Sequence, residues 1–121
     1  MERVRGIGGM FFKAEQPELL ARWYDERLGV GATPESYDVP VWVQEAGPTV
    51  FAPFGRDHWA SPHLGPTGWG INFRVQDLAA MVAQLRAADI PVDVDEEVYP
   101  NGRFAQIHDP EGNAVQLWEP R

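Results

Sequence analysis

The chain has 121 residues, of which 44% are hydrophobic and 23% charged, and this predicts one globular domain with an ordinary core. Its net charge of -8 predicts no binding to nucleic acid or to an anionic membrane, because association would begin with electrostatic repulsion. The absence of cysteine excludes disulfides, thiolate nucleophiles and cysteine metal ligands. No apolar run is long enough to cross a bilayer, and charges interrupt the N-terminal stretch, so we expect a cytoplasmic protein.

The first half predicts the order βαβββ. Residues 7–14 read as a strand, and Pro17 suits the first turn of a helix whose apolar residues recur at helical spacing until Gly29. Further strands are predicted at 33–37, 39–44 and 49–54. These elements define a first repeat over about residues 4–54.

The same order follows a linker at 55–68 that is rich in glycine and proline. A strand is predicted at 70–75, and Asp77 is a good N-cap for the helix after it. Strands at 91–98, 103–108 and 114–118 complete a second repeat over about 69–119. The sequence Asp109-Pro110-Glu111-Gly112 predicts a tight turn between the last two strands.

The two halves form a weak internal repeat. A shift of 61 positions, from Gly9 to Gly70, also aligns Phe12 with Phe73 and Lys13 with Arg74. Two βαβββ units could pack their helices outside and leave a curved sheet around a cleft. We therefore predict a single α+β domain over residues 1–121, built as a half-open barrel with outer helices.

Three segments resemble the vicinal-oxygen-chelate superfamily, the fold of glyoxalase I, bleomycin-resistance proteins and extradiol dioxygenases. Residues 102–120, GRFAQIHDPEGNAVQLWEP, are similar to the family's closing strand, turn and strand. Residues 21–29 and 72–78 resemble the end of its first helix and its fifth strand leading into the second helix. The resemblance covers nearly the whole chain and implies a glyoxalase-like domain.

Family enzymes hold a divalent metal on side chains from the first and last strand of each repeat. In this sequence those positions fall on Gly9, Phe51, Gly70 and Gln116. A lone neutral amide cannot offset the lost hydration of a cation, so we expect no metal and no other cofactor, with a divalent metal as the alternative. Glu119 should point to the opposite face from Gln116 and is interpreted as a solvated terminal charge.

Aromatic and polar side chains are predicted to line the cleft. The candidates are Phe11, Trp42, Phe51, Asn72, Arg74, Gln116 and Trp118. An aromatic cleft with a few polar groups suits a small organic molecule, although the same rings could fill a core or a dimer interface. The resemblance to bleomycin-resistance proteins implies binding without chemistry and a homodimer. Arg74 and its repeat equivalent Lys13 could pair with an anionic group or remain exposed charges.

The histidines leave two enzymatic alternatives open. His58 and His63 lie in the linker near Asp57 and are interpreted as surface or lid residues. A metal-dependent glyoxalase- or dioxygenase-type enzyme would use Gln116, His108 and the linker histidines as ligands. A metal-free enzyme would use His108 as a general base.

Overall fold

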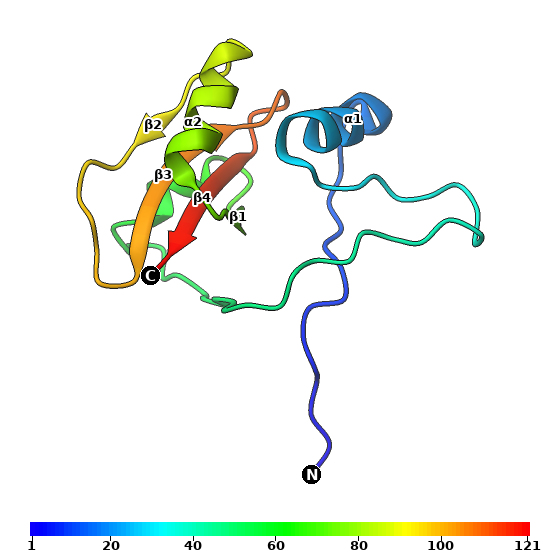
Figure 1. Cartoon of the computed structure of the whole chain (residues 1–121). Coiled ribbons are helices and arrows are strands. Elements are labelled where there is room, and N and C mark those ends of the chain that lie inside the picture. The colour runs from blue at the N-terminus through cyan, green and yellow to red at the C-terminus, as the bar shows by residue number, and fades with distance from the viewer.

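The computed structural model describes residues 1–121 and has two helices, a short 3-10 helix and four strands (Figure 1). In chain order these are α1 (Pro17–Leu28), η1 (Ser61–Leu64), β1 (Gly70–Arg74), α2 (Leu78–Ala87), β2 (Asp93–Val94), β3 (Gly102–His108) and β4 (Ala114–Pro120). The structure thus confirms the α+β class. None of the helices has the length and apolar character that crossing a membrane requires.

The four strands form one open sheet in the order β1-β4-β3-β2. Strands β3 and β4 are antiparallel, and β1 lies parallel to β4 on its other side. The predicted turn joins β3 to β4, since Gly112 N donates to Asp109 O at 2.9 Å and Asp109 N donates to Asn113 O at 3.0 Å. The helix and strands predicted after residue 69 therefore form, although the predicted strand at 91–98 shortens to β2.

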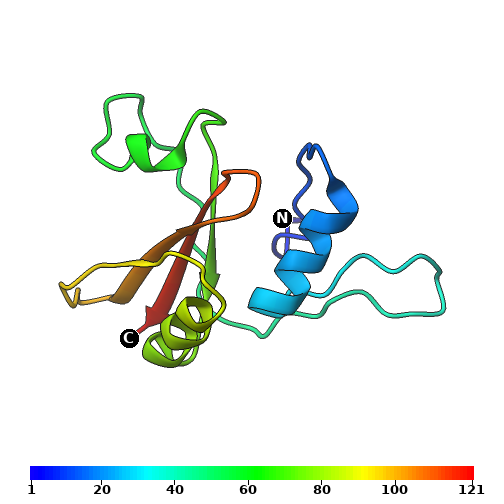
Figure 2. The same cartoon turned by 90° about the horizontal axis from the view of Figure 1, so that it is seen from above.

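The core lies between α2 and one face of the sheet (Figure 2), and Leu20 and Tyr24 of α1 also belong to it. The largest fully buried side chains come from both layers: Leu78, Leu85, Ile107, Val115 and Leu117. Removing each such side chain from water contributes about 1.5–3 kcal/mol, before the entropy of ordering it is subtracted. The linker and η1 lie on the other side of the sheet (Figure 2).

Helix α1 is tied to the turn between β3 and β4. Tyr24 is buried, and its hydroxyl donates to Asp109 Oδ2 at 2.7 Å. Glu111 accepts hydrogen bonds from Glu15 N at 2.7 Å and Gln16 N at 3.2 Å, which satisfies free N–H groups where the helix begins. Gly29 ends α1 with φ of 74°, as predicted. The helix is therefore held by a turn far away in the sequence.

The strands predicted in the first half are not formed. Residues 7–14, 33–37, 39–44 and 49–54 have no ladder of backbone hydrogen bonds and are largely exposed. The segment at 33–37 runs into bends and a turn, and the other three follow extended paths (Figure 1). An apolar, alternating sequence is a strand only when a neighbouring strand takes up its N–H and C=O groups. The first repeat thus contributes its helix, and the sheet remains open rather than curving into a half-open barrel.

Candidate ligand-binding face

The face of the sheet turned away from α2 carries the polar and aromatic side chains of three neighbouring strands. Ile71 and Phe73 pack against the core, so Gly70, Asn72 and Arg74 point to the opposite, open face. The strand register places these side chains in cross-strand rows. The rows are Phe104, Trp118 and Arg74; then Gln106, Gln116 and Asn72; then His108, Ala114 and Gly70.

The first row is aromatic and tightly held. The ring planes of Phe104 and Trp118 are parallel within 1°, with centroids 6.1 Å apart, and Tyr99 meets Phe104 edge-on at 5.8 Å. Trp118 Nε1 donates to Asn101 O at 2.8 Å, which fixes the indole orientation. Gly102 leaves room for this arrangement, because a Cβ there would lie 2.9 Å from Trp118 Nε1. Trp118 is consequently buried, at 7% exposure.

Tyr99 at the edge of this row stays neutral over a wide pH range. Its hydroxyl donates to Asp95 Oδ2 at 2.8 Å. This hydrogen bond, followed by desolvation, raises the pKa of Tyr99 to about 12. The row therefore presents uncharged rings at neutral pH.

The second row consists of amides. Asn72 Nδ2 donates to Gln116 Oε1 at 2.7 Å, which leaves the Asn72 carbonyl and the Gln116 amino group available. Arg74, in the aromatic row, donates from Nη2 to Glu45 O at 2.8 Å, which links β1 to the first half of the chain. The open face thus offers aromatic rings, hydrogen-bonding amides and one cation.

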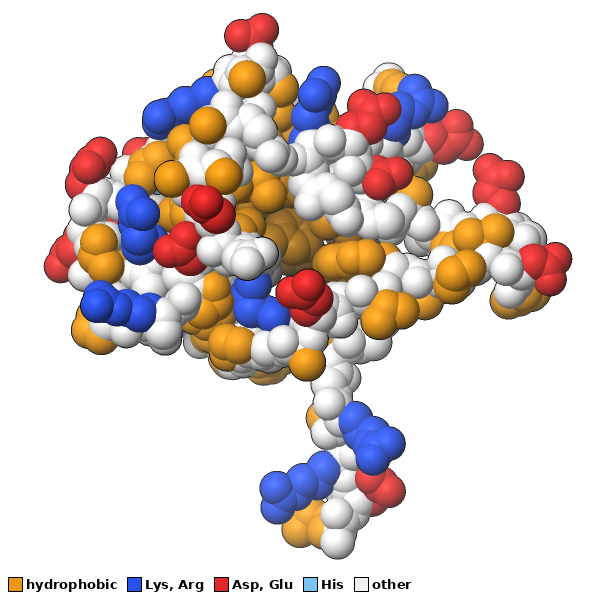
Figure 3. Space-filling model, in the orientation of Figure 1, with side chains coloured by type: hydrophobic (Ala, Val, Ile, Leu, Met, Phe, Trp, Pro, Cys, Tyr) orange, Lys and Arg blue, Asp and Glu red, His pale blue; other side chains and the backbone are white.

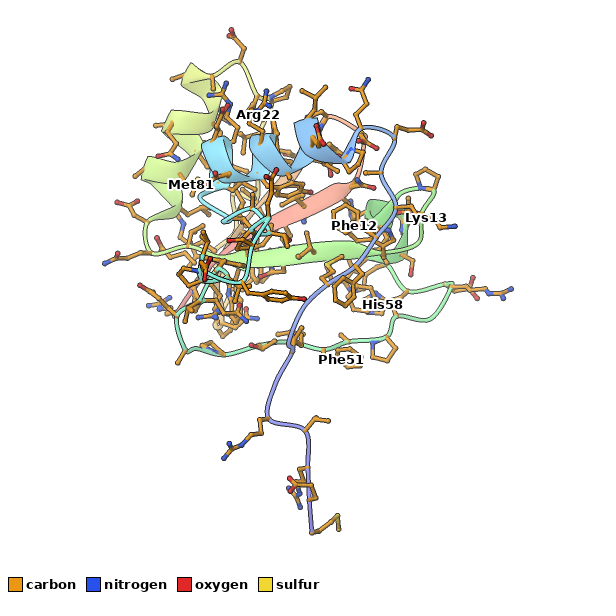
Figure 4. The ribbon with its side chains drawn as sticks, turned by 90° about the vertical axis from the view of Figure 1, so that its right-hand side faces the viewer. Phe12, Lys13, Arg22, Phe51, His58 and Met81 are labelled. Carbon is orange, nitrogen blue, oxygen red and sulfur yellow. The ribbon has the colours of Figure 1, made fainter.

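The structure brings together four of the seven predicted cleft residues. Asn72, Arg74, Gln116 and Trp118 are neighbours on β1 and β4. Phe11 and Phe51 belong to the extended first half, where they are 96% and 87% exposed. Trp42 is 46% exposed in the same half. Figure 4 shows Phe51 on the outer segment and Lys13 pointing away from the body of the molecule.

The residues at the metal positions implied by the resemblance do not fit a metal ion. A Cβ at Gly70 would lie 3.0 Å from Leu64 Cδ2, so a leucine from η1 fills the space beside that position. The Gln116 carbonyl is already bonded to Asn72. No group of three or more His, Asp or Glu side chains is placed to hold a metal ion. A divalent cation needs three or more such donors, and the residues at these positions do not supply them.

Glu119 has a structural role that the sequence did not reveal. Its Oε1 accepts from Leu78 N at 2.9 Å, at the N-terminus of α2, where Asp77 Oδ1 also accepts from Ala80 N at 3.0 Å. Glu119 points to the helix face, opposite Gln116, as predicted. Its interpretation as a solvated terminal charge was wrong, because β4 runs beside β1 and brings Glu119 to the start of α2.

The histidines are split between two places. His58 stacks on Phe54 with ring centroids 4.5 Å apart, and its Nδ1 accepts from Ala60 N at 3.1 Å. His63 and His108 instead line one open hollow together with Asp93 and Gln106. The side chain of His108 is exposed and has no hydrogen-bond partner that would orient it as a general base. One possible sign of this hollow was the pairing of Asp93 with Gln106, and finding it required the register of β2 against β3.

Comparison with solved structures supports the fold. TnmS3, an antibiotic binding protein from Streptomyces sp. CB03234, is 25% identical to this chain, with 88% of each chain covered and a TM-score of 0.53. A glyoxalase family protein from Bacillus anthracis is 18% identical, with 85% of this chain and 84% of that chain covered and a TM-score of 0.51. The chain has the glyoxalase fold. The resemblance to the vicinal-oxygen-chelate superfamily is thereby confirmed.

A further similarity is confined to part of the chain. A glyoxalase/bleomycin resistance protein from Streptomyces sp. CB03234 is 34% identical, but the match covers 41% of this chain and 43% of that chain with a TM-score of 0.38. This chain thus spans less than half of that protein. No protein-family model and no curated protein matches this glyoxalase-fold chain.

Proposed function

We propose that this protein binds a small organic molecule on the open face of its sheet, without a metal ion. The observation that carries the proposal is the pair of adjacent rows, Phe104 and Trp118 beside Asn72 and Gln116. Small-molecule sites combine apolar and aromatic walls with a few placed polar groups. The partly exposed ring of Phe104, backed by the buried Trp118, would contact a planar apolar part of the ligand, and the amides would bond to its polar edge.

The comparison with TnmS3 supports a ligand of antibiotic size. That protein is described as antibiotic binding, and its likeness to this chain extends over 88% of each. Binding requires no metal donors, which agrees with Leu64 occupying the space beside Gly70. The proposal therefore assigns the protein to sequestration or sensing of its ligand rather than to chemistry.

We further propose that a second copy of the chain covers the first half. Apart from Val98, every exposed large hydrophobic side chain lies in residues 1–59, including Phe11, Val43 and Phe51. Figure 3 shows hydrophobic side chains along the extended loop that leaves the body of the molecule. Monomeric proteins rarely expose this much connected apolar surface. Each copy would offer both these apolar stretches and the unpaired outer edge of β1, so a twofold pair satisfies both.

Ligand binding is tested by a thermal-shift screen of antibiotics of several classes, followed by calorimetric titration of the hits in buffer with EDTA. The proposal expects saturable binding that EDTA does not change. Arg74→Met and Asn72→Leu should weaken it at least tenfold. Arg22→Met, which removes the same charge from the exposed side of α1, is the matched control. Absence of any hit, or binding that EDTA abolishes, contradicts the proposal.

The dimer is tested by sedimentation velocity over a range of protein concentrations. A species of twice the chain mass that dissociates on dilution supports it. Replacing Val43 and Phe51 with serine should shift the equilibrium toward the monomer, because both side chains are exposed in one copy. A wild-type chain that remains monomeric at every concentration contradicts it.

A further inference from the structure

A second place in the molecule combines a cavity with converging polar groups. An open hollow of about 510 Å³ lies between the linker and the β2–β3 edge of the sheet. Its walls include His63 and Pro62 from η1, Pro91 and Asp93 around β2, and Gln106 and His108 from β3. None of these residues belongs to the predicted cleft set. The volume lies within the roughly 300–1,000 Å³ range of small-molecule sites.

The wall contributed by the linker is held in place by two kinds of contact. Leu64 packs on β1 at Gly70, where even a single added methyl group would lie only 3.0 Å from Leu64 Cδ2. Within the linker, Ser61 Oγ donates to Gly55 O at 2.6 Å and His58 N donates to the same oxygen at 3.0 Å. Hydrogen bonds at the start of η1 and packing of Leu64 at its end therefore hold the segment that carries His63.

The opposite wall is fixed by the sheet. Asp93 is the direct partner of Gln106 in the antiparallel pair of β2 and β3, and His108 lies two residues further along the same face. The Asp93 carboxylate is exposed and accepts no hydrogen bond from the protein. A ligand in the hollow can reach it without breaking an existing contact.

The charges of the hollow select among ligands. Asp93 is its only carboxylate, and no lysine or arginine lines it. Two imidazoles and one primary amide add groups that can donate or accept hydrogen bonds. These side chains are not grouped as metal ligands, so the hollow is suited to a larger molecule than a bare ion. The net charge of -8 would also favour the approach of a cation.

We propose that this hollow binds a compact organic cation, a protonated amine that carries hydroxyl groups. The ammonium group pairs with Asp93, and the hydroxyl groups bond to His63, Gln106 and His108. The prolines supply flat, apolar walls on either side. The hollow shares Gln106 with the amide row, but none of the four side chains that carry the first proposal, Phe104, Trp118, Asn72 and Gln116, lines it.

The test uses glucamine, a polyol whose primary amine is protonated at about pH 7.5, and sorbitol, its neutral counterpart. Calorimetric titration of the full chain should give saturable binding of glucamine and at least tenfold weaker binding of sorbitol. Asp93→Asn should weaken glucamine binding at least tenfold. Glu96→Gln, which removes an equal charge three residues away and outside the hollow, should leave it unchanged.

The position of the ligand is read by nuclear magnetic resonance. Glucamine should shift the imidazole ring signals of His63 and His108 and leave those of His58 in place, since His58 lies outside the hollow. Gly70→Val would push Leu64 and η1 away and should weaken binding even though it changes no polar group. The proposal is overturned if glucamine does not saturate, if sorbitol binds equally well, or if Asp93→Asn and Glu96→Gln have the same effect. An antibiotic whose binding is weakened by Arg74→Met should bind equally well to Asp93→Asn. The two proposals can therefore be tested, and can fail, separately.

Discussion

The two halves of the chain carry similar alternating patterns, yet only the second folds on itself. Residues 70–120 form a sheet, a helix and a core in which Ile107, Val115 and Leu117 are almost completely buried. Residues 1–59 form α1 and little else, and nearly all of the exposed large hydrophobic side chains lie there. An alternating apolar pattern makes a strand possible, but the strand forms only where a second strand lies beside it and pairs with its backbone.

The difference has a local cause. In the second half a short turn brings β3 directly beside β4, so the longest ladder forms between neighbouring segments. In the first half, α1 and an extended stretch separate residues 7–14 from any apolar segment that could pair with them. Their backbone groups then remain with solvent until another strand approaches. The outer edge of β1, which pairs with β4 on its inner side only, is free to accept such a strand.

The largest expected effect is in the core of the second half. Leu117→Ala removes a fully buried side chain and should lower the free energy of unfolding by about 2–5 kcal/mol in urea titrations. Val41→Ala, at a position 66% exposed in the first half, should change it by less than about 0.5 kcal/mol in the monomer. If both variants lost the same free energy of unfolding as monomers, the two halves would not differ in packing as described. A loss for Val41→Ala that appears only in the dimer would support the proposed pairing of two copies.

A smaller effect is expected at the contact between the halves. Tyr24→Phe removes the hydrogen bond to the Asp109 carboxylate, which also accepts from Asn113 Nδ2 at 2.7 Å. Bonds to charged groups contribute about 1.5–3 kcal/mol, and the remaining donors keep Asp109 partly satisfied, so we expect a loss near the lower end. Unfolding in urea near neutral pH measures it. Tyr37→Phe, at a fully exposed tyrosine, is the control and should have no effect.

The same tyrosine predicts a pH dependence. Desolvation by burial, reinforced by Asp109, raises the pKa of Tyr24 above its ordinary value of 10.0. The unfolded chain therefore releases this proton first, so the contribution of Tyr24 is complete below about pH 10 and falls as the pH rises further. The stability difference between the wild type and Tyr24→Phe should shrink over that range. A difference that stays constant would mean that Tyr24 is not protected in the folded chain.

Much of the fold could be predicted because its signals are local. Pro17 and Gly29 mark the ends of α1, Asp77 caps α2, and the turn at 109–112 joins β3 to β4. The residues that escaped prediction act over long distances in the sequence. Glu119 caps a helix that begins 41 positions earlier, and Leu64 fills the space beside Gly70. Only the folded arrangement brings these pairs together.

The residues of the candidate site show the same difference between local and long-range signals. Asn72, Arg74, Gln116 and Trp118 could be placed on one face from strand alternation alone. Phe11, Trp42 and Phe51 were assigned to that face by the repeat, which requires first-half strands that do not form in the single chain. The hollow beside η1 was not predicted, because irregular linker residues give no register from which to place His63.

The smallest expected effect concerns the start of α1, where Glu111 takes the place of a local cap. Gln16 makes no side-chain cap bond, and the N–H groups of Glu15 and Gln16 donate to the Glu111 carboxylate instead. Glu111→Ala should cost about 0.5–2 kcal/mol, comparable to the loss of an N-cap, whereas Glu111→Gln keeps an acceptor and should cost less. Unfolding followed by urea titration measures both, with Glu96→Ala as the exposed control. If Glu111→Ala behaves like Glu96→Ala, α1 is held to the second half by Tyr24 and apolar packing alone, and the first half is even more loosely attached than the comparison implies.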